Sequence, residues 1–276
     1  MKQSSKKVED KWERLLSLLR EMESVLVAFS AGVDSTFLLY AAVEALGQDK
    51  VLAVTAKSRL NPERQFVEAG EYPEALGVRH LVIQSKELQI PRFRDNPPDR
   101  CFICKTELFT GFKQIAESEG YRQVVDGSNA SDLGDYRPGM RALKNLGIRS
   151  PLLEAGLTKA DIRLLSRQAG LPTWNKPSFA CLSSRFPYGV KITDEDLAKV
   201  DAAESFLYEL GLDGSVRVRH HGSIARIEVD PVNFGKLIES GLSAKVVEKF
   251  KSLGYKYITL DLEGFRTGSM NEVIQR

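Results

Sequence analysis

The stretch SVLVAFSAGVDSTFLL, residues 24–39, decides the fold. Its first part, VLVAF at 25–29, is a continuous apolar run, which is typical of a buried strand in a parallel sheet. Small and polar residues follow at 30–35, and residues 36–43 have the apolar character of a packed helix. Such a strand, tight loop and helix leave unpaired backbone N–H groups at the helix start, where the helix dipole also favours an anion. We therefore predict a phosphate-binding site at the head of this helix.

The side chains of the loop suit the same purpose. The hydroxyls of Ser30, Ser35 and Thr36 add hydrogen-bond donors, and the Asp34 carboxylate can hold a metal ion or orient a nucleophile. The pattern is not the Walker loop, which has four residues between its glycines and a Lys-Ser/Thr pair. The alternative is a serine-rich turn of an ordinary doubly wound protein. The strand before the loop and the helix after it favour the phosphate site.

The loop resembles the S-G-G-x-D-S pyrophosphate loop of the PP-loop ATP pyrophosphatases, which include GMP synthetase, NAD synthetase, argininosuccinate synthetase and the tRNA-thiolating enzymes. The resemblance implies that ATP adenylates a substrate oxygen and that pyrophosphate leaves into the loop, with Mg²⁺ held partly by Asp34. Ala31 stands at the second position of the motif and resists a positive φ, so we expect an intact, slightly atypical loop. The ATP-binding residues that the resemblance implies are Ala28, Phe29, Ser30, Ala31, Gly32, Val33, Asp34 and Ser35.

Composition bounds the class of protein. The 276 residues suffice for one large domain or two modest ones, and 42% apolar with 28% charged residues is ordinary for a soluble protein. The net charge of +2 does not indicate a nucleic-acid partner. No apolar run reaches the roughly 18 residues of a membrane span, and residues 1–11 lack a signal-peptide core. We expect a cytoplasmic protein without a membrane partner.

Helix and strand patterns alternate through the first two thirds of the chain. This alternation predicts an α/β fold with a parallel sheet, in which ligands bind at the carboxyl ends of the strands. The expected helices cover residues 8–22, 36–46, 64–76, 101–118 and 159–169, and the expected strands cover 25–29, 51–56, 80–83, 123–127 and 150–153.

A different pattern begins after Gly189. Thr193 is suited to cap a helix that has acidic residues in its first turn. The expected elements that follow are strands at 216–220 and 224–229, a helix at 234–253 and a strand at 257–262. We therefore predict a PP-loop domain at residues 1–189 and a smaller α+β domain, for substrate binding or oligomerisation, at 190–276. We expect a homo-oligomer.

The three cysteines suggest metal, cluster or thiol chemistry, because they are too few for a disulfide framework. Cys101 and Cys104 form a C-x-x-C pair, and Cys181 follows 77 residues later. A zinc site would require a fourth ligand, and unrelated buried thiols are a further alternative. Three thiolates without an obvious fourth ligand suit a [4Fe–4S] cluster with one open iron. That iron could hold an extra sulfide as the sulfur donor.

The segment NKPSFACLSSRFPYG, residues 175–189, is the second landmark. It has no helical or strand period but concentrates cysteine, aromatic, hydroxyl and arginine residues, and such loops are often functional. Together with the phosphate loop and the cysteines, it resembles the LarE-type ATP-dependent sulfur transferases. The most specific stretches of the resemblance are SSRFPYG at 183–189, VRVR at 216–219, IARIE at 224–228 and LDLEGFRTG at 260–268.

The resemblance implies a reaction. LarE-type enzymes adenylate a carboxylate of pyridinium-3,5-biscarboxylic acid mononucleotide and replace oxygen with sulfur, which makes a thiocarboxylate for the nickel-pincer cofactor of lactate racemase. Some members sacrifice one cysteine's own sulfur and become dehydroalanine at that site. The three cysteines here resemble the cluster-bearing branch instead. The implied cofactors are ATP, Mg²⁺ and a [4Fe–4S] cluster held by Cys101, Cys104 and Cys181, with sulfide or another sulfur donor as partner.

The resemblance also implies binding residues. A substrate with one phosphate and two carboxylates suits planar arginine forks, although alternating arginines on a strand are otherwise typical of a solvated face with surface ion pairs. Lys105 is expected to steady pyrophosphate or the adenylate. The implied nucleotide-binding residues outside the loop are Thr55, Ala56, Lys57, Gly127 and Arg137. The implied substrate-binding residues are Ser184, Arg185, Glu204, Arg217, Arg219, Glu228 and Arg266.

Three other functions remain open from the sequence. A tRNA-thiolating enzyme would use the same loop and cysteines, but it normally adds RNA-binding modules and a more basic surface. An amidating synthetase that uses ammonia would not need three cysteines. A nucleotide-binding module would bind ATP without releasing pyrophosphate.

Overall fold

The chain forms two compact units in a computed structural model that describes residues 2–62, 70–134, 138–177, 180–239, 241–266 and 268–272. The first unit comprises Met1–Ser58, Arg64–Glu87 and Asp99–Lys176, and the second comprises Arg59–Glu63, Leu88–Pro98 and Pro177–Arg276. The segment at 177–189 thus belongs to the same unit as the residues after it. The functional boundary after Gly189 stays a prediction. No helix among the described residues is long and apolar enough to cross a membrane.

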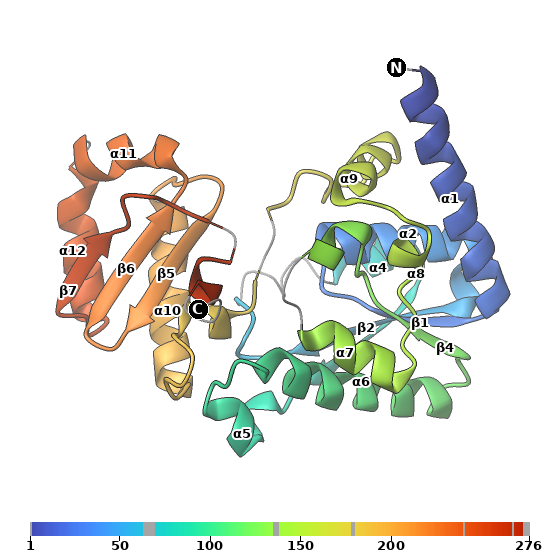
Figure 1. Ribbon diagram of the computed structural model, residues 1–276, viewed down its shortest axis with the longest axis horizontal. Coiled ribbons are helices and arrows are strands. Elements are labelled where there is room, and N and C mark those ends of the chain that lie inside the picture. The colour runs from blue at the N-terminus through green and yellow to red at the C-terminus, as the bar shows by residue number, and fades with distance from the viewer. Residues whose placement is uncertain are drawn as a thin grey trace. The chain divides into compact units, whose positions relative to one another are not determined.

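A parallel sheet forms the centre of the first unit (Figure 1). Its strands are β1 Val25–Ala28, β2 Val51–Lys57, β3 Arg79–Gln84 and β4 Gln123–Val125, in the order β3-β2-β1-β4. All three neighbouring pairs are parallel, with Val25 opposite Val51. The predicted α/β class is therefore confirmed, and the carboxyl ends of β1, β2 and β4 share one edge.

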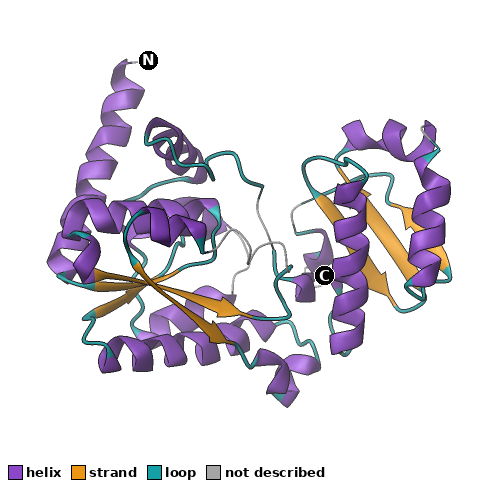
Figure 2. Cartoon of the chain, turned by 180° about the vertical axis from the view of Figure 1, so that it is seen from behind, coloured by secondary structure: helices purple, strands orange, loops and turns teal. Residues whose placement is uncertain are grey.

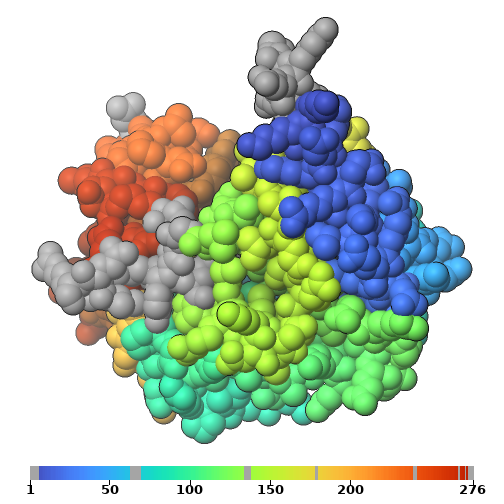
Figure 3. Space-filling model, turned by 45° about the vertical axis from the view of Figure 1, so that its right-hand side comes forward, coloured from blue at the N-terminus to red at the C-terminus, as the bar shows by residue number. Residues whose placement is uncertain are grey.

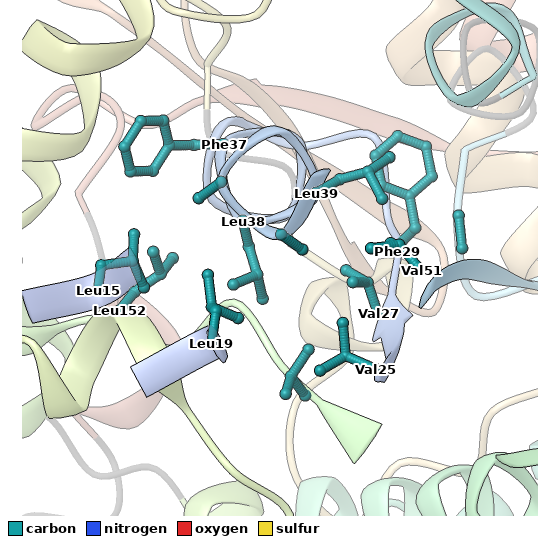
Figure 4. Close-up of a cluster of buried hydrophobic side chains, with 14 of the residues drawn as sticks. Leu15, Leu19, Val25, Val27, Phe29, Phe37, Leu38, Leu39, Val51 and Leu152 are labelled. Atoms are coloured by element: carbon teal, nitrogen blue, oxygen red, sulfur yellow. The ribbon is translucent and has the colours of Figure 1, made fainter. Parts of the chain in front are cut away.

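Both faces of this sheet are covered because the strand residues are apolar on both sides. Val25 and Val27 pack into one core with Leu15, Leu38 and Leu152 (Figure 4). Leu26, on the opposite face, packs into a second core with residues of α6 and α7. The helices of this unit are α1 Lys2–Met22, α2 Val33–Leu46, α4 Glu71–Ala75, α6 Arg100–Ser118, α7 Pro138–Leu146, α8 Pro151–Glu154 and α9 Lys159–Gln168, with short 3-10 turns at Gln48–Lys50, Glu87–Gln89 and Ala130–Gly134.

Helix α1 lies along the outside of the first unit beside α8 and α9 (Figure 3). Its inward residues Leu15 and Leu19 have no exposed surface. Lys11 Nζ lies 2.6 Å from Asp161 Oδ2 on α9, and the Trp12 ring stacks on Tyr40 of α2. The predicted helix at 8–22 is thus confirmed.

The structure corrects two expected elements and leaves part of a third undescribed. Residues 151–154 form α8 and not a fifth strand, because Pro151 at the first helical position pre-sets a helical φ. Arg149, just before this stretch, forms an isolated parallel bridge to Val125 of the sheet. The helix expected at 234–253 is broken into α11 Phe234–Glu239 and α12 Leu242–Ser252, since Gly241 adopts a left-handed φ of 69°. Of the helix expected at 64–76, the described part is α4, and residues 63–69 lie outside the described chain.

The second unit is built on a mixed three-stranded sheet. Strands β5 Val216–His221 and β6 Ile224–Val229 are antiparallel, and β7 Tyr257–Leu260 is parallel to β6. Helix α10 Asp194–Glu209 lies across one face of the sheet (Figure 2), and Thr193 caps it by accepting a hydrogen bond from the Asp196 amide, as predicted. The remaining short elements are α5 Pro91–Arg94 and 3-10 turns at Leu182–Arg185, Pro231–Asn233 and Ser269–Asn271.

Candidate nucleotide and sulfur-transfer sites

The side chain of Ser35 makes three contacts within the phosphate loop. Ser35 Oγ accepts the Ser30 amide at 3.2 Å, lies 3.1 Å from Ser30 Oγ and donates to the Gly32 carbonyl at 3.3 Å. The helix begins at Val33, so its first N–H groups have no acceptor within the helix. The loop therefore joins the end of β1 to the start of α2 with its backbone donors available for an anion.

Ala31 adopts the conformation that its glycine counterpart would favour. Its φ is 55°, in the left-handed region. An alanine in that region is strained by about 1–2 kcal/mol relative to a right-handed conformation. The Ala31 carbonyl accepts a hydrogen bond from Lys176 Nζ at 3.0 Å. The loop is therefore intact and strained at one residue.

Asp34 lies on the first turn of α2 with its two carboxylate oxygens in different environments. Oδ2 accepts a hydrogen bond from Lys159 Nζ of α9 at 2.7 Å. Oδ1 is buried without a hydrogen-bond partner among the described residues, and so is Thr36 Oγ1. Burial raises the pKa of Asp34, although Lys159 opposes this shift. Buried polar atoms without partners mark a place where a ligand can complete the hydrogen bonds.

The end of β4 comes close to the phosphate loop. A Cβ added to Gly127 would lie 3.2 Å from the Ser35 amide nitrogen and 3.3 Å from atoms of Asp34. The carboxylate of Asp126, the residue before Gly127, lies 3.4 Å from Lys105 Nζ. Lys105 therefore reaches the same segment at the end of β4 that approaches the loop. A side chain at position 127 would therefore crowd the backbone at the start of α2.

Two lysines that contact the loop, Lys159 and Lys176, lie in no sequence motif that predicts this role. Lys159 reaches Asp34 across 125 residues of sequence, and Lys176 reaches Ala31 across 145 residues. The only local signal is the Thr158–Asp161 capping box, which fixes the start of α9 and so the position of Lys159. The predicted nucleotide-binding residue Arg137 lies outside the described residues.

Thr55, one of the residues predicted to hold adenine, makes two hydrogen-bond contacts within the protein. Its hydroxyl donates to the Phe29 carbonyl at 2.9 Å and lies 2.8 Å from His80 Nε2, so that it links β2 to the residue after β1 and to the second residue of β3. Burial lowers the pKa of His80, which favours the neutral ring. Ala56 and Lys57 follow at the carboxyl end of β2, and their role in adenine binding stays a prediction.

Cys101 and Cys104 lie one turn apart on α6 and therefore on the same face of that helix. Cys101 is exposed. The thiol of Cys104 lies 3.8 Å from Glu87 Oε1, and Glu87 is buried and also accepts a hydrogen bond from Ser58. Within the described ranges, no three His, Cys, Asp or Glu side chains are grouped to hold a metal ion. The predicted [4Fe–4S] cluster stays a prediction.

In the second unit, a buried ion pair anchors the segment around Cys181. Arg185 and Glu204 have no exposed side-chain surface. Arg185 Nε and Nη2 donate to the two carboxylate oxygens of Glu204 at 2.8 and 2.9 Å. Burial by itself would raise the pKa of Glu204, but Arg185 holds it below its usual value. Cys181 Sγ lies 3.0 Å from Ser183 Oγ.

The arginines of β5 do not form a solvated face. Arg217 and Arg219 are 4% and 5% exposed, and Glu228 is fully buried. Arg219 Nη2 lies 2.6 Å from Glu228 Oε2, and its Nη1 donates to the Ser184 carbonyl at 3.1 Å. Arg219 Nε is buried without a partner in the described part of the chain. The surface alternative for these residues is therefore wrong.

The two other arginines predicted to bind substrate differ in exposure. Arg217 lies over the Phe265 ring at 5.1 Å, and burial, with repulsion from Arg185, lowers the pKa of Arg217. Arg266 is partly exposed and pairs with Glu263 at 2.8 Å. Of the four arginines predicted to bind substrate, Arg185, Arg217 and Arg219 are therefore buried, and Arg266 is partly exposed.

A parallel sheet with an SAGVDS loop at the head of α2 defines the protein as a PP-loop ATP pyrophosphatase. The NAD synthase family model matches residues 10–93. The chain is 28% identical to argininosuccinate synthase of Natronomonas pharaonis over 56% of this chain and 41% of that protein.

Two relatives span nearly the whole chain. The pyridinium-3,5-bisthiocarboxylic acid mononucleotide synthase of Lactiplantibacillus plantarum is 39% identical over 95% of this chain and 94% of its own length. An uncharacterised protein of Synechocystis is 40% identical over 98% of this chain and 100% of its own length. The chain therefore belongs to the LarE-type ATP-dependent sulfur transferases.

Proposed function

We propose that this protein adenylates a carboxylate of pyridinium-3,5-biscarboxylic acid mononucleotide and replaces its oxygen with sulfur. The observation that carries the proposal is the phosphate loop at the head of α2, with Asp34 Oδ1 buried and unpartnered among the described residues. The name of the Lactiplantibacillus relative supports this choice of substrate.

In the first step, a substrate carboxylate oxygen attacks the α-phosphorus of ATP, and pyrophosphate leaves. The backbone N–H groups of the loop bind the phosphates, and Lys105 and Lys159 neutralise the charge that develops on the leaving group. Asp34 would hold Mg²⁺ through Oδ1, and this ion would supply further charge neutralisation. Thr55, Ala56, Lys57 and Gly127 are proposed to contact the nucleoside part of ATP.

In the second step, a sulfur nucleophile attacks the acyl carbon of the adenylate, and AMP leaves with its oxygen. The product is the thiocarboxylate. A [4Fe–4S] cluster held by Cys101, Cys104 and Cys181 would supply an iron that carries the attacking sulfide. The spacing of Cys101 and Cys104 on one helix face fits two ligands of such a cluster.

The substrate is proposed to bind through arginine, serine and carboxylate side chains of the second unit. Arg219 has a buried Nε without a partner among the described residues, which a substrate phosphate or carboxylate could satisfy. Arg266 is partly exposed and so accessible to a ligand. The residues proposed for this role are Ser184, Arg217, Arg219, Glu228 and Arg266.

Pyrophosphate release tests the adenylation step. The wild-type protein should release pyrophosphate from ATP only when the pyridinium mononucleotide is present. Asp34→Ala should reduce that rate by about 10³-fold, since charge stabilisation of the leaving group is lost. Asp10→Ala, at an exposed position on α1, is the control and should retain the wild-type rate. A normal rate in Asp34→Ala would refute the role of the loop.

Iron and acid-labile sulfide content test the cysteines. Protein prepared without oxygen should hold about four irons per chain. Cys101→Ala, Cys104→Ala and Cys181→Ala should each lose iron and sulfur transfer while retaining ATP binding. One variant that continues multiple turnovers with sulfide would contradict a shared cluster, and zinc or intact thiols without metal would indicate a different sulfur donor.

A further inference from the structure

We infer that the buried Arg185–Glu204 pair positions the Cys181 segment, residues 180–185, for sulfur transfer, and that Arg185 does not bind the substrate. This inference rests on the proposed function and revises the role that the family resemblance implies for both residues. The geometry of the guanidinium group carries it.

Arg185 has no nitrogen left over for a substrate. Its side chain has no exposed surface. Nε and Nη2 donate to Glu204, and Nη1 donates to the Ala180 carbonyl at 2.8 Å, to the Cys181 carbonyl at 3.2 Å and to Ser184 Oγ at 2.9 Å. A substrate carboxylate would have to displace one of these acceptors from a buried site.

The contacts of Nη1 fix the backbone on both sides of Cys181. The Ala180 carbonyl belongs to the peptide group before the Cys181 Cα, and the Cys181 carbonyl belongs to the peptide group after it. When both peptide planes are fixed, φ and ψ of Cys181 are fixed, and so is the direction of its Cα–Cβ bond. Arg185 thus fixes the direction in which the Cys181 side chain leaves the backbone, and the thiol itself lies 3.0 Å from Ser183 Oγ.

The other side of the pair is tied to the core of the second unit. Glu204 lies on α10, and its Oε1 also accepts the Val218 amide of β5 at 2.9 Å. Arg219, also on β5, holds the Ser184 carbonyl at 3.1 Å. The Cys181 segment is therefore attached to α10 through Arg185 and Glu204, and to β5 through Arg219.

A lysine cannot reproduce this arrangement, because it lacks the planar fork that donates to a carboxylate and to two carbonyls together. Misplacement of a reacting group by about 1 Å can slow a reaction by about 10²-fold. The chemistry of adenylation does not involve the thiol of Cys181. Loss of Arg185 should therefore slow sulfur transfer selectively.

Arg185→Lys and Glu204→Gln test this inference in single-turnover reactions that follow pyrophosphate and thiocarboxylate separately. Thiocarboxylate formation should fall by about 10–100-fold, while pyrophosphate release and the KM for the pyridinium mononucleotide should stay within about twofold of wild type. Leu207→Ala, in the core of the second unit, is the control for lost stability and should change neither step selectively. Glu204→Gln keeps the side-chain shape and serves where Arg185→Lys does not fold.

A raised KM with slower pyrophosphate release in Arg185→Lys would overturn the inference, because Arg185 would then contact the substrate. Unchanged thiocarboxylate formation would overturn it too. Amide hydrogen exchange tests the positioning role without an activity assay. This test therefore remains valid even if the wild type releases no pyrophosphate and the proposed function fails. Exchange at Leu182 and Ser184, whose amides donate to Leu60 and Cys181, should become about 10-fold faster in Arg185→Lys. Unchanged exchange would overturn the positioning role.

Discussion

The phosphate loop and the Cys181 segment are both short irregular stretches, but they are held in opposite ways. Within the loop, the side-chain hydrogen bonds come from Ser35, whose partners lie no more than five residues away along the chain. The Cys181 segment is held by Arg185, whose partner Glu204 is 19 residues away, and by Arg219, which is 35 residues from Ser184. The internal hydrogen bonds of the loop are local and are supplemented by two distant lysines, Lys159 and Lys176, whereas the Cys181 segment is held mainly by residues of other elements.

The two stretches also differ in what they leave unsatisfied. The loop region leaves Asp34 Oδ1 and Thr36 Oγ1 buried without partners among the described residues. In the Cys181 segment, every nitrogen of Arg185 has an acceptor. Because buried polar groups are normally paired, open atoms indicate a ligand. A buried charge whose every nitrogen already has an acceptor within the protein indicates a structural task.

The largest expected effect is on stability at the Cys181 segment. Glu204→Ala should lower the free energy of unfolding by about 3 kcal/mol, because it leaves the Arg185 charge buried and unpaired. Urea denaturation followed by fluorescence or circular dichroism measures this change. A loss below about 1 kcal/mol is typical of an exposed ion pair. Such a result would show that the Arg185–Glu204 pair does not anchor the Cys181 segment.

Acid should sharpen the same contrast, because the pKa shifts of the two carboxylates have opposite signs. The pKa of Glu204 is lowered by Arg185, so its stabilisation is complete above the pKa of the unfolded chain and is lost as the pH falls through the folded value. The pKa of Asp34 is raised by burial, so its protonation favours the folded state. Unfolding measured from pH 7 to 3 should show a smaller acid loss in Glu204→Gln and an undiminished loss in Asp34→Asn.

A side chain at Gly127 should disturb the nucleotide site. Gly127→Ala places a Cβ 3.2 Å from the Ser35 amide, and overpacking of this kind costs about 1–3 kcal/mol. The KM for ATP should rise about tenfold, which corresponds to about 1.4 kcal/mol. Gly111→Ala on α6, where the added Cβ meets nothing within 4 Å, is the matched control and should leave the KM unchanged. Equal KM values in both variants would show that the loop tolerates a side chain there.

Asp34 should matter little for stability, in contrast to Glu204. Its ion pair with Lys159 is partly exposed, and such pairs contribute about 0–1 kcal/mol. Asp34→Asn should therefore change the free energy of unfolding by less than about 1 kcal/mol, although it should impair pyrophosphate release. A large loss of stability would assign Asp34 a structural role.

The smallest expected effect is at Ala31. Ala31→Gly removes the strain of a φ of 55° and should raise the free energy of unfolding by roughly 0.5–1 kcal/mol. Ala45→Gly, within α2, should instead lower it by about 0.5–1 kcal/mol. Thermal unfolding of the two variants should thus shift in opposite directions.

Sequence patterns predicted those features whose causes lie within a few residues of one another. The apolar run at 25–29 predicted β1, the small residues at 30–35 predicted the loop, and Thr193 predicted the start of α10. Each of the two failed predictions followed an apolar pattern that a single proline or glycine overrode. At 150–153, Pro151 starts a helix where the apolar pattern suggested a strand, and at 234–253 a single left-handed glycine, Gly241, breaks a continuous apolar period.

The amino-acid sequence alone determined the fold class, the phosphate loop and the family resemblance, because apolar periodicity, small residues and short motifs act locally along the chain. Only the tertiary structure decided that Lys159 neutralises Asp34 across 125 residues and that the arginines of β5 are buried. It also decided that Arg185 is fully occupied by Glu204 and by the backbone of the Cys181 segment. The partner of a buried charge depends on which distant elements pack together, and this packing produces no local pattern in the sequence.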